Sequence, residues 1–344
     1  MRKEPNIKRK GVENMTRILM DFPNRPGMHC ASKSLRDIGE FYGHDLSEAE
    51  IFGLSSGLGA VYINLSEPIA IRLFGGRILD LESGFFKNMD IPFKWRFGPV
   101  FRWNEIRSYI DRNIPVIVIA DLKYLDYYQT NSLFGGHSMV IIGYDDVSEE
   151  VFLVDVNQPD IQRLKLSSLK RAMSSYAPGF PFKTNQWAPV EQLPLLQNAS
   201  MYAKAIEQNA YHLLKDCRET FEAFADDIRK WNRIETWKYF SITLYEMIER
   251  RGSGGAAFRN LYIDFLRTWH RKYGDDYSGC EDVISGFQAS IDGWNEFSSI
   301  LLQAARRGTS FKLNQAADRL HDIYEKEEAC FVQLKELLKA PAVG

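Results

Sequence analysis

A cysteine, a histidine and an aspartate lie in this sequence where each could take part in thiol chemistry. Cys30 follows a glycine-containing turn at residues 26–29 and starts an amphipathic pattern, which predicts a thiol in the first turn of a helix. Backbone N–H groups and the positive end of the helix dipole favour a thiolate there. His137 opens an apolar strand pattern after two glycines, and Asp155 closes the next strand pattern. The thiolate would attack an acyl carbon, the imidazole would transfer protons, and the carboxylate would orient the imidazole.

This order of cysteine, histidine and aspartate is the one used by papain-like thiol enzymes. A single buried cysteine or histidine is more often structural, but the three residues together favour a catalytic site. Asn157, which we expect on the same strand face as Asp155, is the alternative orienting residue. Asn24 stands six residues before Cys30, where papain-like peptidases carry an oxyanion-binding glutamine, although its sequence is also typical of an ordinary turn. His29 should point away from the thiol, because successive helical residues are rotated by about 100°.

The composition is that of an ordinary globular protein. The chain has 344 residues, 45% of them hydrophobic and 26% charged, with a formal net charge of −2, so no nucleic-acid or membrane partner is indicated. Its four cysteines, at positions 30, 217, 280 and 330, show no metal-binding spacing, and we expect no bound metal or cofactor. A basic run at residues 2–10 resembles a solvated terminus more than a nucleic-acid arm. With no signal peptide or transmembrane pattern, a cytoplasmic location is expected, and an oligomer remains open.

The patterns that must position these residues predict an α+β domain followed by an all-α helical bundle. Apolar runs predict strands at 61–65, 69–73, 115–120, 139–144 and 151–155, and helices at 32–42, 47–50 and 103–113. Four prolines mark residues 176–194 as a linker. Beyond it, apolar residues at helical spacing predict helices at 201–217, 219–230, 235–251, 256–272, 280–306 and 313–338. The predicted parts are an extension (1–19), a catalytic domain (20–175), the linker (176–194) and a helical domain (195–340).

A glycine-rich segment at residues 252–255 interrupts the helical region. It leads into a helix pattern that contains Arg259, and a glycine-rich turn at a helix N-terminus can bind an anion. The spacing differs from that of a P-loop, and no strand precedes the segment. It is therefore either a tight turn between helices or a loop that packs onto the thiol domain or binds a substrate phosphate or carboxylate. In the last case Gly254, Gly255 and Arg259 would bind the substrate.

The sequence resembles the butirosin biosynthesis protein H family. The resemblance rests on residues 27–35 around Cys30, on the segments 46–48 and 52–54, and on Gly136-His137-Ser138. Residues 252–255 and 258–266 resemble the helical domain that often follows in that family. The resemblance implies a papain-like fold with Cys30 as nucleophile, His137 as base and Asp155 as orienting carboxylate.

The resemblance also implies an activity. The butirosin protein moves an aminoacyl chain from the phosphopantetheine thioester of an acyl carrier protein to an amine of an aminoglycoside. We therefore expect a cysteine-dependent acyltransferase that takes its acyl group from a carrier-protein or CoA-type thioester and gives it to a small-molecule amine. An acidic carrier would dock on basic residues, either Arg96, Arg102 and Arg107 or Arg163, Lys165, Lys170 and Arg171. A cysteine peptidase or amidase and a non-catalytic binding protein are the alternatives.

Overall fold

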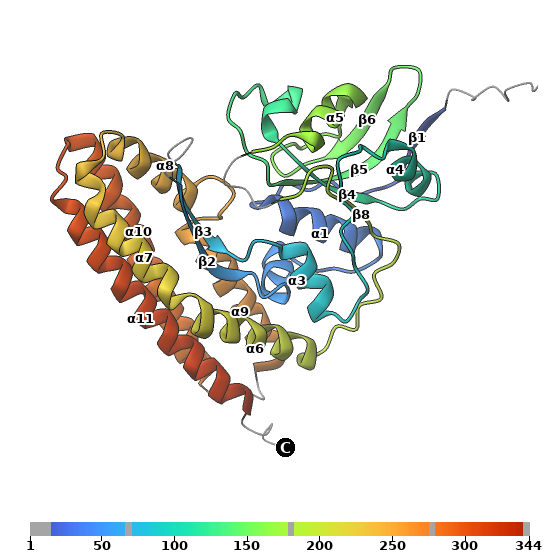
Figure 1. Ribbon diagram of the computed structural model, residues 1–344. Helices are drawn as coiled ribbons and strands as arrows, with labels where there is room; N and C mark the ends of the chain where they lie inside the picture. Colours follow the sequence, from blue (N-terminus) through green and yellow to red (C-terminus); the bar gives the residue numbers. More distant parts are fainter. Residues whose placement is uncertain (1–14, 66–70, 178–181, 275–278, 340–344) are drawn as a thin grey trace, which may run out of the picture.

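The computed structural model describes residues 15–65, 71–177, 182–274 and 279–339. Within them an antiparallel sheet with its helices, a two-stranded hairpin and a group of long helices lie against one another (Figure 1). The elements in chain order are β1 (Thr16–Ile18), α1 (Cys30–Phe41), α2 (Glu48–Leu54), β2 (Leu58–Leu65), β3 (Ile71–Arg77), α3 (Leu81–Asn88), α4 (Trp103–Ile110), β4 (Val116–Ala120), η1 (Leu122–Tyr124), η2 (Asp126–Tyr128), β5 (His137–Asp145), β6 (Glu150–Val154), β7 (Gln162–Lys165), α5 (Leu166–Ser174), β8 (Trp187–Pro189), α6 (Ala199–Asp216), α7 (Arg218–Lys230), η3 (Trp231–Arg233), α8 (Trp237–Glu249), η4 (Ala256–Phe258), α9 (Arg259–Tyr273), α10 (Cys280–Arg307) and α11 (Lys312–Lys339).

The main sheet carries two of the predicted chemical residues. Its strand order is β7-β6-β5-β4-β8, every pairing is antiparallel, and β1 adds to β5. Strands β4 and β5 are buried almost throughout, because α1 lies below the sheet and α5 above it in Figure 1. Burial on both faces accounts for their continuous apolar sequences. The strands predicted at 115–120, 139–144 and 151–155 are confirmed as β4, β5 and β6.

Two segments expected to lie outside the catalytic domain belong to its sheet. Strand β8 lies inside the predicted linker at 176–194, and it pairs with β4 while its Trp187 is 1% exposed. Proline does not prevent this, because an edge strand leaves some of its N–H groups unpaired in any case. Strand β1 lies inside the predicted extension at 1–19 and pairs with residues 143–145 of β5. The sheet therefore extends beyond both predicted boundaries.

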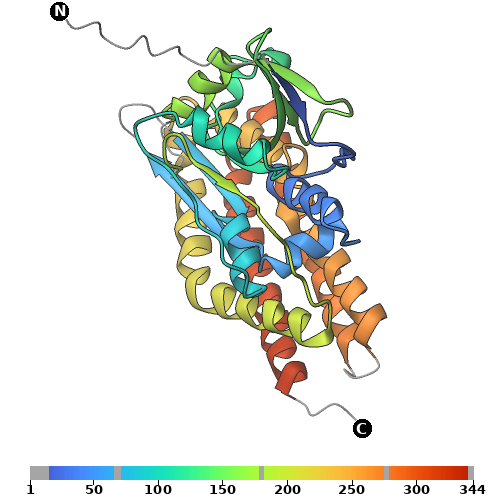
Figure 2. The same ribbon diagram turned by 90° about the vertical axis from the view of Figure 1, so that its right-hand side faces the viewer.

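The hairpin of β2 and β3 and helix α2 join the two predicted domains. The hairpin leaves the main sheet and lies along the helices of the C-terminal region, as the light-blue strands in Figure 2 show. Phe74 on β3 packs against Phe224 and Trp294, with ring centroids 4.7 and 5.4 Å away. A Cβ atom at Gly53 in α2 would lie 2.0 Å from the Phe265 ring of α9, so only glycine permits this close approach. The two regions therefore share one continuous apolar core.

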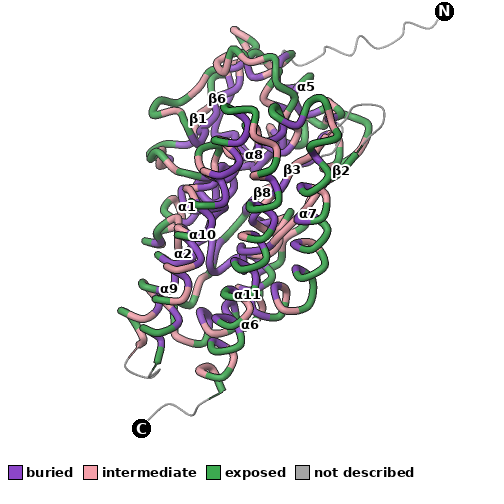
Figure 3. Tube along the Cα trace, turned by 90° about the vertical axis from the view of Figure 1, so that its left-hand side faces the viewer, coloured by how far each residue is buried: buried purple, intermediate pink, exposed green. Residues whose placement is uncertain are grey.

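The helices predicted beyond residue 200 are confirmed as α6 to α11. Helices α10 and α11 form a long antiparallel pair, and α6 and α7 pack along α11 (Figure 1). Each helix buries one stripe and exposes the other, so purple and green alternate along the tubes in Figure 3. Arg259 and Glu327, both completely buried, form an ion pair between α9 and α11. This part of the fold matches the expected helical bundle.

Some sequence predictions fall outside the described residues. These are the basic run at 2–10, Ile69 and Ala70 of a predicted strand, and Pro178 and Pro181 of the predicted linker. In the part of the chain that the structure describes, none of the helices has the length and apolar character needed to cross a membrane.

Candidate active site

Helix α1 begins at Cys30, which places the thiol in the first helical turn. His29 is the N-cap residue, with extended backbone angles (φ −127°, ψ 136°), and its Nδ1 accepts the backbone N–H of Ser32 at 3.4 Å. The Glu48 carboxylate accepts the N–H groups of Met28 and His29 at 2.8 and 2.7 Å and the Ser32 hydroxyl at 2.9 Å. Side-chain oxygens that satisfy free N–H groups in this way stabilise a helix start. The backbone around the thiol is therefore held firmly in place.

His137 and Asp155 come together at one end of the sheet. His137 is the first residue of β5, and Asp155 directly follows β6, which pairs with β5. His137 Nε2 lies 2.7 Å from Asp155 Oδ1, and both side chains are buried. Asp155 also accepts hydrogen bonds from the Tyr127 hydroxyl at 2.8 Å and from the Val156 N–H at 2.6 Å. The carboxylate engages Nε2 and so leaves Nδ1 as the ring nitrogen available to other groups.

The Cys30 thiol completes this group, because it lies close enough to His137 for the two side chains to shift each other's pKa. Burial alone would raise the pKa of the thiol, but His29 and His137 together lower it well below its usual value. Burial alone would lower the pKa of His137, but the Asp155 carboxylate and the thiolate raise it to about 10. Each charge stabilises the other, so the favoured state at neutral pH is a thiolate–imidazolium pair. Such a pair is a nucleophile ready to attack an acyl carbon.

The other cysteines differ from Cys30 in their electrostatic surroundings. Burial raises the pKa of Cys217 and of Cys280 to about 11, and that of Cys330 to about 12. At Cys217 the effect of burial exceeds that of the nearby Arg259 charge, and a buried thiol with a raised pKa stays protonated and unreactive. Among the four cysteines, Cys30 alone has a lowered pKa.

The expectation that His29 points away from the thiol is wrong. Its imidazole lies close enough to the Cys30 side chain to lower the pKa of the thiol, and it is 3% exposed. The reason is that His29 is the N-cap residue with extended backbone angles, so the helical rotation between successive residues does not apply to it. Because its Nδ1 accepts the Ser32 N–H, neutral His29 carries its proton on Nε2. Burial lowers the pKa of His29, which favours that neutral form.

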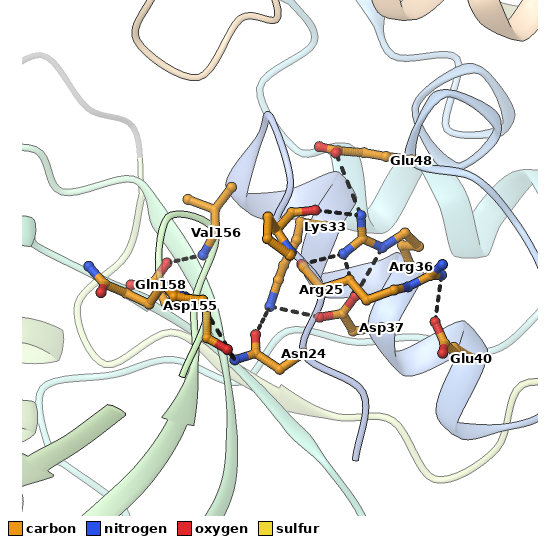
Figure 4. Close-up of polar contacts among 12 residues, drawn as sticks. Asn24, Arg25, Lys33, Arg36, Asp37, Glu40, Glu48, Asp155, Val156 and Gln158 are labelled. Carbon is orange, nitrogen blue, oxygen red and sulfur yellow. Dashed lines mark hydrogen bonds and ion pairs between the residues drawn. The ribbon is translucent and has the colours of Figure 1, made fainter. Parts of the chain in front are cut away.

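Asn24 does not face the thiol, which corrects its candidacy as an oxyanion donor. Its Nδ2 group donates to the carbonyl oxygens of Gln158 and Pro159 at 3.3 and 3.0 Å. Its Oδ1 accepts from Lys33 Nζ at 2.7 Å. The amide thereby connects α1 to the turn that follows Asp155 (Figure 4). Asn24 has the structural role that its turn-like sequence also suggested.

A buried ion pair strengthens the same connection. Lys33 lies one turn after Cys30, and its Nζ is 2.7 Å from Asp37 Oδ2, with both side chains completely buried. Arg36 donates to the Asp37 carboxylate at 2.7 Å and to the Arg25 carbonyl at 2.5 Å (Figure 4). These contacts hold α1 against the loop before it and so fix the thiol relative to the sheet.

Asn157 does not orient His137. It lies in the turn after β6 and is exposed, rather than on the strand face of Asp155 as expected. Strand β6 ends at Val154, so the alternation of side chains along a strand no longer applies at residue 157. Its side chain lies close enough to Tyr128 to affect the pKa of that hydroxyl, and the Tyr128 ring meets His137 edge-on at 5.5 Å. Asp155 makes the shorter contact to His137 Nε2, at 2.7 Å, and the Tyr128 hydroxyl lies 3.5 Å from the same nitrogen.

The glycine-rich segment packs onto the thiol region, whereas Arg259 has a structural role. A Cβ atom at Gly254 would lie 3.1 Å from Met28 Sδ, so this loop lies beside the turn that precedes Cys30. Arg259 is completely buried and forms two bonds of 2.8 Å with Glu327. It also donates to the Gly76 carbonyl of β3 at 3.0 Å. The expectation that Arg259 binds substrate is therefore wrong, because its donors are used inside the protein.

The segment after these glycines has an uncommon backbone conformation. Ala256, Ala257 and Phe258 have φ angles of 45°, 49° and 74°, in the left-handed region that such residues rarely adopt. The Phe258 ring stacks on Phe52 at 5.5 Å and meets the His29 ring edge-on at 5.2 Å. Backbone strain of this kind persists only where surrounding contacts hold it, and it is common at functional sites. The helical region thus supplies one wall around His29.

Several residues near the thiol have no role assigned from the sequence. Tyr127 contacts Asp155, although 28 residues separate them in the chain. Glu48 contacts His29 at the start of α1, although 19 residues separate them. Glu82, in the first turn of α3, is 3% exposed and close enough to Cys30 for their charges to interact. No residue spacing predicts such contacts, because they depend on how α2, α3 and η2 pack around α1 and the sheet.

The two predicted basic patches differ in the described structure. Arg96 stacks on Tyr109 and Trp187, and Arg107 pairs with Asp146 at 2.8 Å. These two side chains are thus already engaged. In the second patch Lys170 and Arg171 are exposed. Lys165 of that patch pairs with Glu150 at 2.9 Å, so the part of it that stays open is Lys170 and Arg171.

Comparison with known proteins gives two family matches. Residues 29–156 match the family described as Butirosin biosynthesis protein H, N-terminal, and residues 167–334 match Domain of unknown function (DUF4872). The first match extends from His29 to Val156 and so contains Cys30, His137 and Asp155. Among solved structures, a Bacillus anthracis protein described as a C39-like peptidase is 16% identical, with a TM-score of 0.38 over 52% of this chain and 99% of that chain. The search of curated proteins returned no match.

Proposed function

We propose that this chain, which carries a butirosin biosynthesis protein H N-terminal domain followed by a DUF4872 domain, is a cysteine-dependent acyltransferase. It moves an acyl or aminoacyl group from a phosphopantetheine thioester, on a carrier protein or CoA, to a small-molecule amine. The pathway would be a biosynthetic one of the kind that makes antibiotics. The observation that carries this proposal is the Cys30 thiol at the start of α1, beside the His137–Asp155 pair, within that domain.

In the first step Cys30 takes the acyl group. The thiolate attacks the carbonyl carbon of the thioester, and His137 gives its proton to the departing pantetheine sulfur. Asp155 holds the imidazole through Nε2 and stabilises its charge, while Tyr127 and Val156 hold Asp155. One thioester replaces another, so the step needs no ATP. The products are acyl-Cys30 and a free pantetheine thiol.

In the second step an amine takes the acyl group. Its nitrogen attacks the acyl carbon, His137 removes a proton from the nitrogen, and the bond to Cys30 Sγ breaks. The thiolate–imidazolium pair is thereby restored and an amide is released. Cys30 and His137 expose 8% and 4% of their surfaces. Such limited exposure supports a slender donor such as a pantetheine arm over an extended polypeptide.

The proposal is tested by intact-mass spectrometry of the full chain with an acyl-N-acetylcysteamine thioester. We expect one acyl adduct, located on Cys30 by peptide mapping, and its disappearance when an alkylamine is added. Cys30→Ala should lose the adduct. Cys217→Ala should keep it, because burial leaves the Cys217 thiol protonated. Adducts that persist in Cys30→Ala would overturn the mechanism.

The same experiment separates acyl transfer from the alternatives. Peptide amide substrates are added in place of the thioester, and their products are followed by mass. Cleavage of these amides without aminolysis of the thioester would establish a peptidase or amidase instead. A Cys30 thiol that alkylates no faster than free cysteine at neutral pH would instead indicate a binding protein.

A further inference from the structure

The carboxyl group of Glu82 lies beside the proposed nucleophile and has no role in the chemistry described so far. Glu82 is the second residue of α3, is 3% exposed and lies against Ser138, the residue after His137 on β5. Its Oε1 is buried and forms no hydrogen bond with any described residue. Its charge interacts with those of Asp80 and Cys30, both negative when ionised. Among the described residues, no lysine, arginine or histidine forms an ion pair with it.

A buried carboxylate without a positive partner is costly to a protein. Burial and repulsion from Asp80 raise the pKa of Glu82 to about 7, so the group can both hold and release a proton near neutral pH. Replacing it by an uncharged residue would remove this cost. Retaining it beside a reactive thiol is therefore best explained by a ligand that brings the missing positive charge.

The proton count of the proposed reaction supplies such a ligand. His137 gives up one proton when the pantetheine thiol leaves and regains one when the amine attacks. An alkylamine at neutral pH arrives as an ammonium ion, however, and must lose one proton before it has a lone pair to attack with. His137 cannot take both protons. The other proton must go to solvent before the amine binds, or to a second acceptor near the acyl carbon.

Building on the proposed function, we propose that Glu82 binds the cationic amine acceptor and takes its first proton. The ammonium N–H bond breaks, the proton goes to the Glu82 carboxylate, and the freed lone pair forms the C–N bond to the acyl carbon. The second N–H proton goes to His137, and the C–S bond electrons return to Cys30. Glu82 then releases its proton to solvent. The acceptor is thus a primary ammonium compound, and its charge contributes to its recognition.

The test compares two acceptors on isolated acyl-enzyme, made with the thioester and freed of it by gel filtration. One acceptor is n-propylamine, cationic at pH 7, and the other is hydroxylamine, which is neutral there and needs no first deprotonation. We expect Glu82→Gln to slow aminolysis by n-propylamine about tenfold or more, while the hydroxylamine rate changes by less than about twofold. Glu105→Gln, an exposed residue paired with Arg102, is the matched control and should leave the ratio of the two rates unchanged.

The outcomes separate this inference from the proposed function. Equal slowing of both acceptors in Glu82→Gln, or of neither, would overturn the role of Glu82. Failure of the wild-type chain to form acyl-Cys30 would overturn the proposed function and this inference with it. Thermal melts of both variants establish that they fold, and Glu82→Asp provides a second variant. It keeps the charge but draws it back by one methylene, so it should retain part of the selectivity for n-propylamine.

Discussion

Phe258 of the helical region meets His29, the neighbour of Cys30, edge-on, with ring centroids 5.2 Å apart and planes at 88°. The helical region is therefore part of the wall around the thiol and not a separate module. Met28 beside the Gly254 loop and Phe52 stacked on Phe258 extend the same contact. A deletion of the helical region would remove these supports together with much of the shared core.

His29 should affect both the stability of α1 and the reactivity of Cys30. His29→Ala loses the N-cap and should lower the free energy of unfolding by about 1 kcal/mol. His29→Asn keeps a good cap, so its stability should stay close to that of the wild type. Both variants should raise the pKa of the Cys30 thiol, seen as a shift of the iodoacetamide rate profile to higher pH. An unshifted profile in both variants would show that His29 is only a cap.

Asp155 should matter more to turnover than the tyrosine that holds it. Asp155→Asn removes the charge that raises the pKa of His137, so the thiolate–imidazolium pair weakens, and kcat/KM should fall on the order of 10²–10³-fold. Tyr127→Phe removes one hydrogen bond to a charged group and should cost about tenfold. The measurement is aminolysis of the thioester at saturating and limiting donor. A larger effect of Tyr127→Phe than of Asp155→Asn would contradict this assignment.

Arg259 should prove structural. Arg259→Met leaves Glu327 buried and unpaired, so the free energy of unfolding should fall by about 3–5 kcal/mol in urea titrations. The double variant Arg259→Met/Glu327→Leu removes the unpaired charge and should recover part of that loss. A stable Arg259→Met protein with a raised KM for the donor or acceptor would restore the substrate-binding role.

Glu82 should make the stability of the protein depend on pH. Its pKa is about 7 in the folded protein and about 4.3 in an unfolded chain. Its contribution to the free energy of unfolding is therefore fully present below about pH 4 and is lost as the pH rises through 7. Asp80 and Cys30 are the ionisable groups that face it. Glu82→Gln has no carboxyl group to ionise, so its stability does not suffer this loss. As the pH rises from about 4 to about 8, its free energy of unfolding should increase by about 3 kcal/mol relative to that of the wild type. A difference that does not change with pH would show that Glu82 is ionised normally.

The open basic patch should bind the carrier protein. Lys170→Glu/Arg171→Glu should weaken binding of an acylated carrier about tenfold at low salt, and this difference should shrink as salt is added. Arg306→Glu/Arg307→Glu, a charge reversal of equal size at the end of α10, is the control. Titration by fluorescence anisotropy measures both. Equal weakening by the two double variants would indicate general charge attraction and no specific docking site.

The sequence by itself determined the elements and the chemical types at the site. Apolar spacing predicted a helix over 32–42, a strand over 139–144 and the run of helices from α6 to α11, because periodicity records which face of each element is buried. It failed at β8 and β1, where pairing with β4 and β5 outweighed a proline-rich or terminal context. Local patterns carry no information about such distant pairing.

Only the tertiary structure decided how the side chains meet. In it His29 lies beside the thiol, whereas Asn24 and Asn157 contact groups outside the proposed chemistry. Arg259 is buried against Glu327. It also brought Glu82 from α3 beside Cys30, although more than fifty residues separate them in the chain. Contacts of this kind depend on the packing of several elements at once, so spacing along the chain cannot encode them. The sequence predicted Cys30 as the nucleophile that we propose, and the fold set the charges around it.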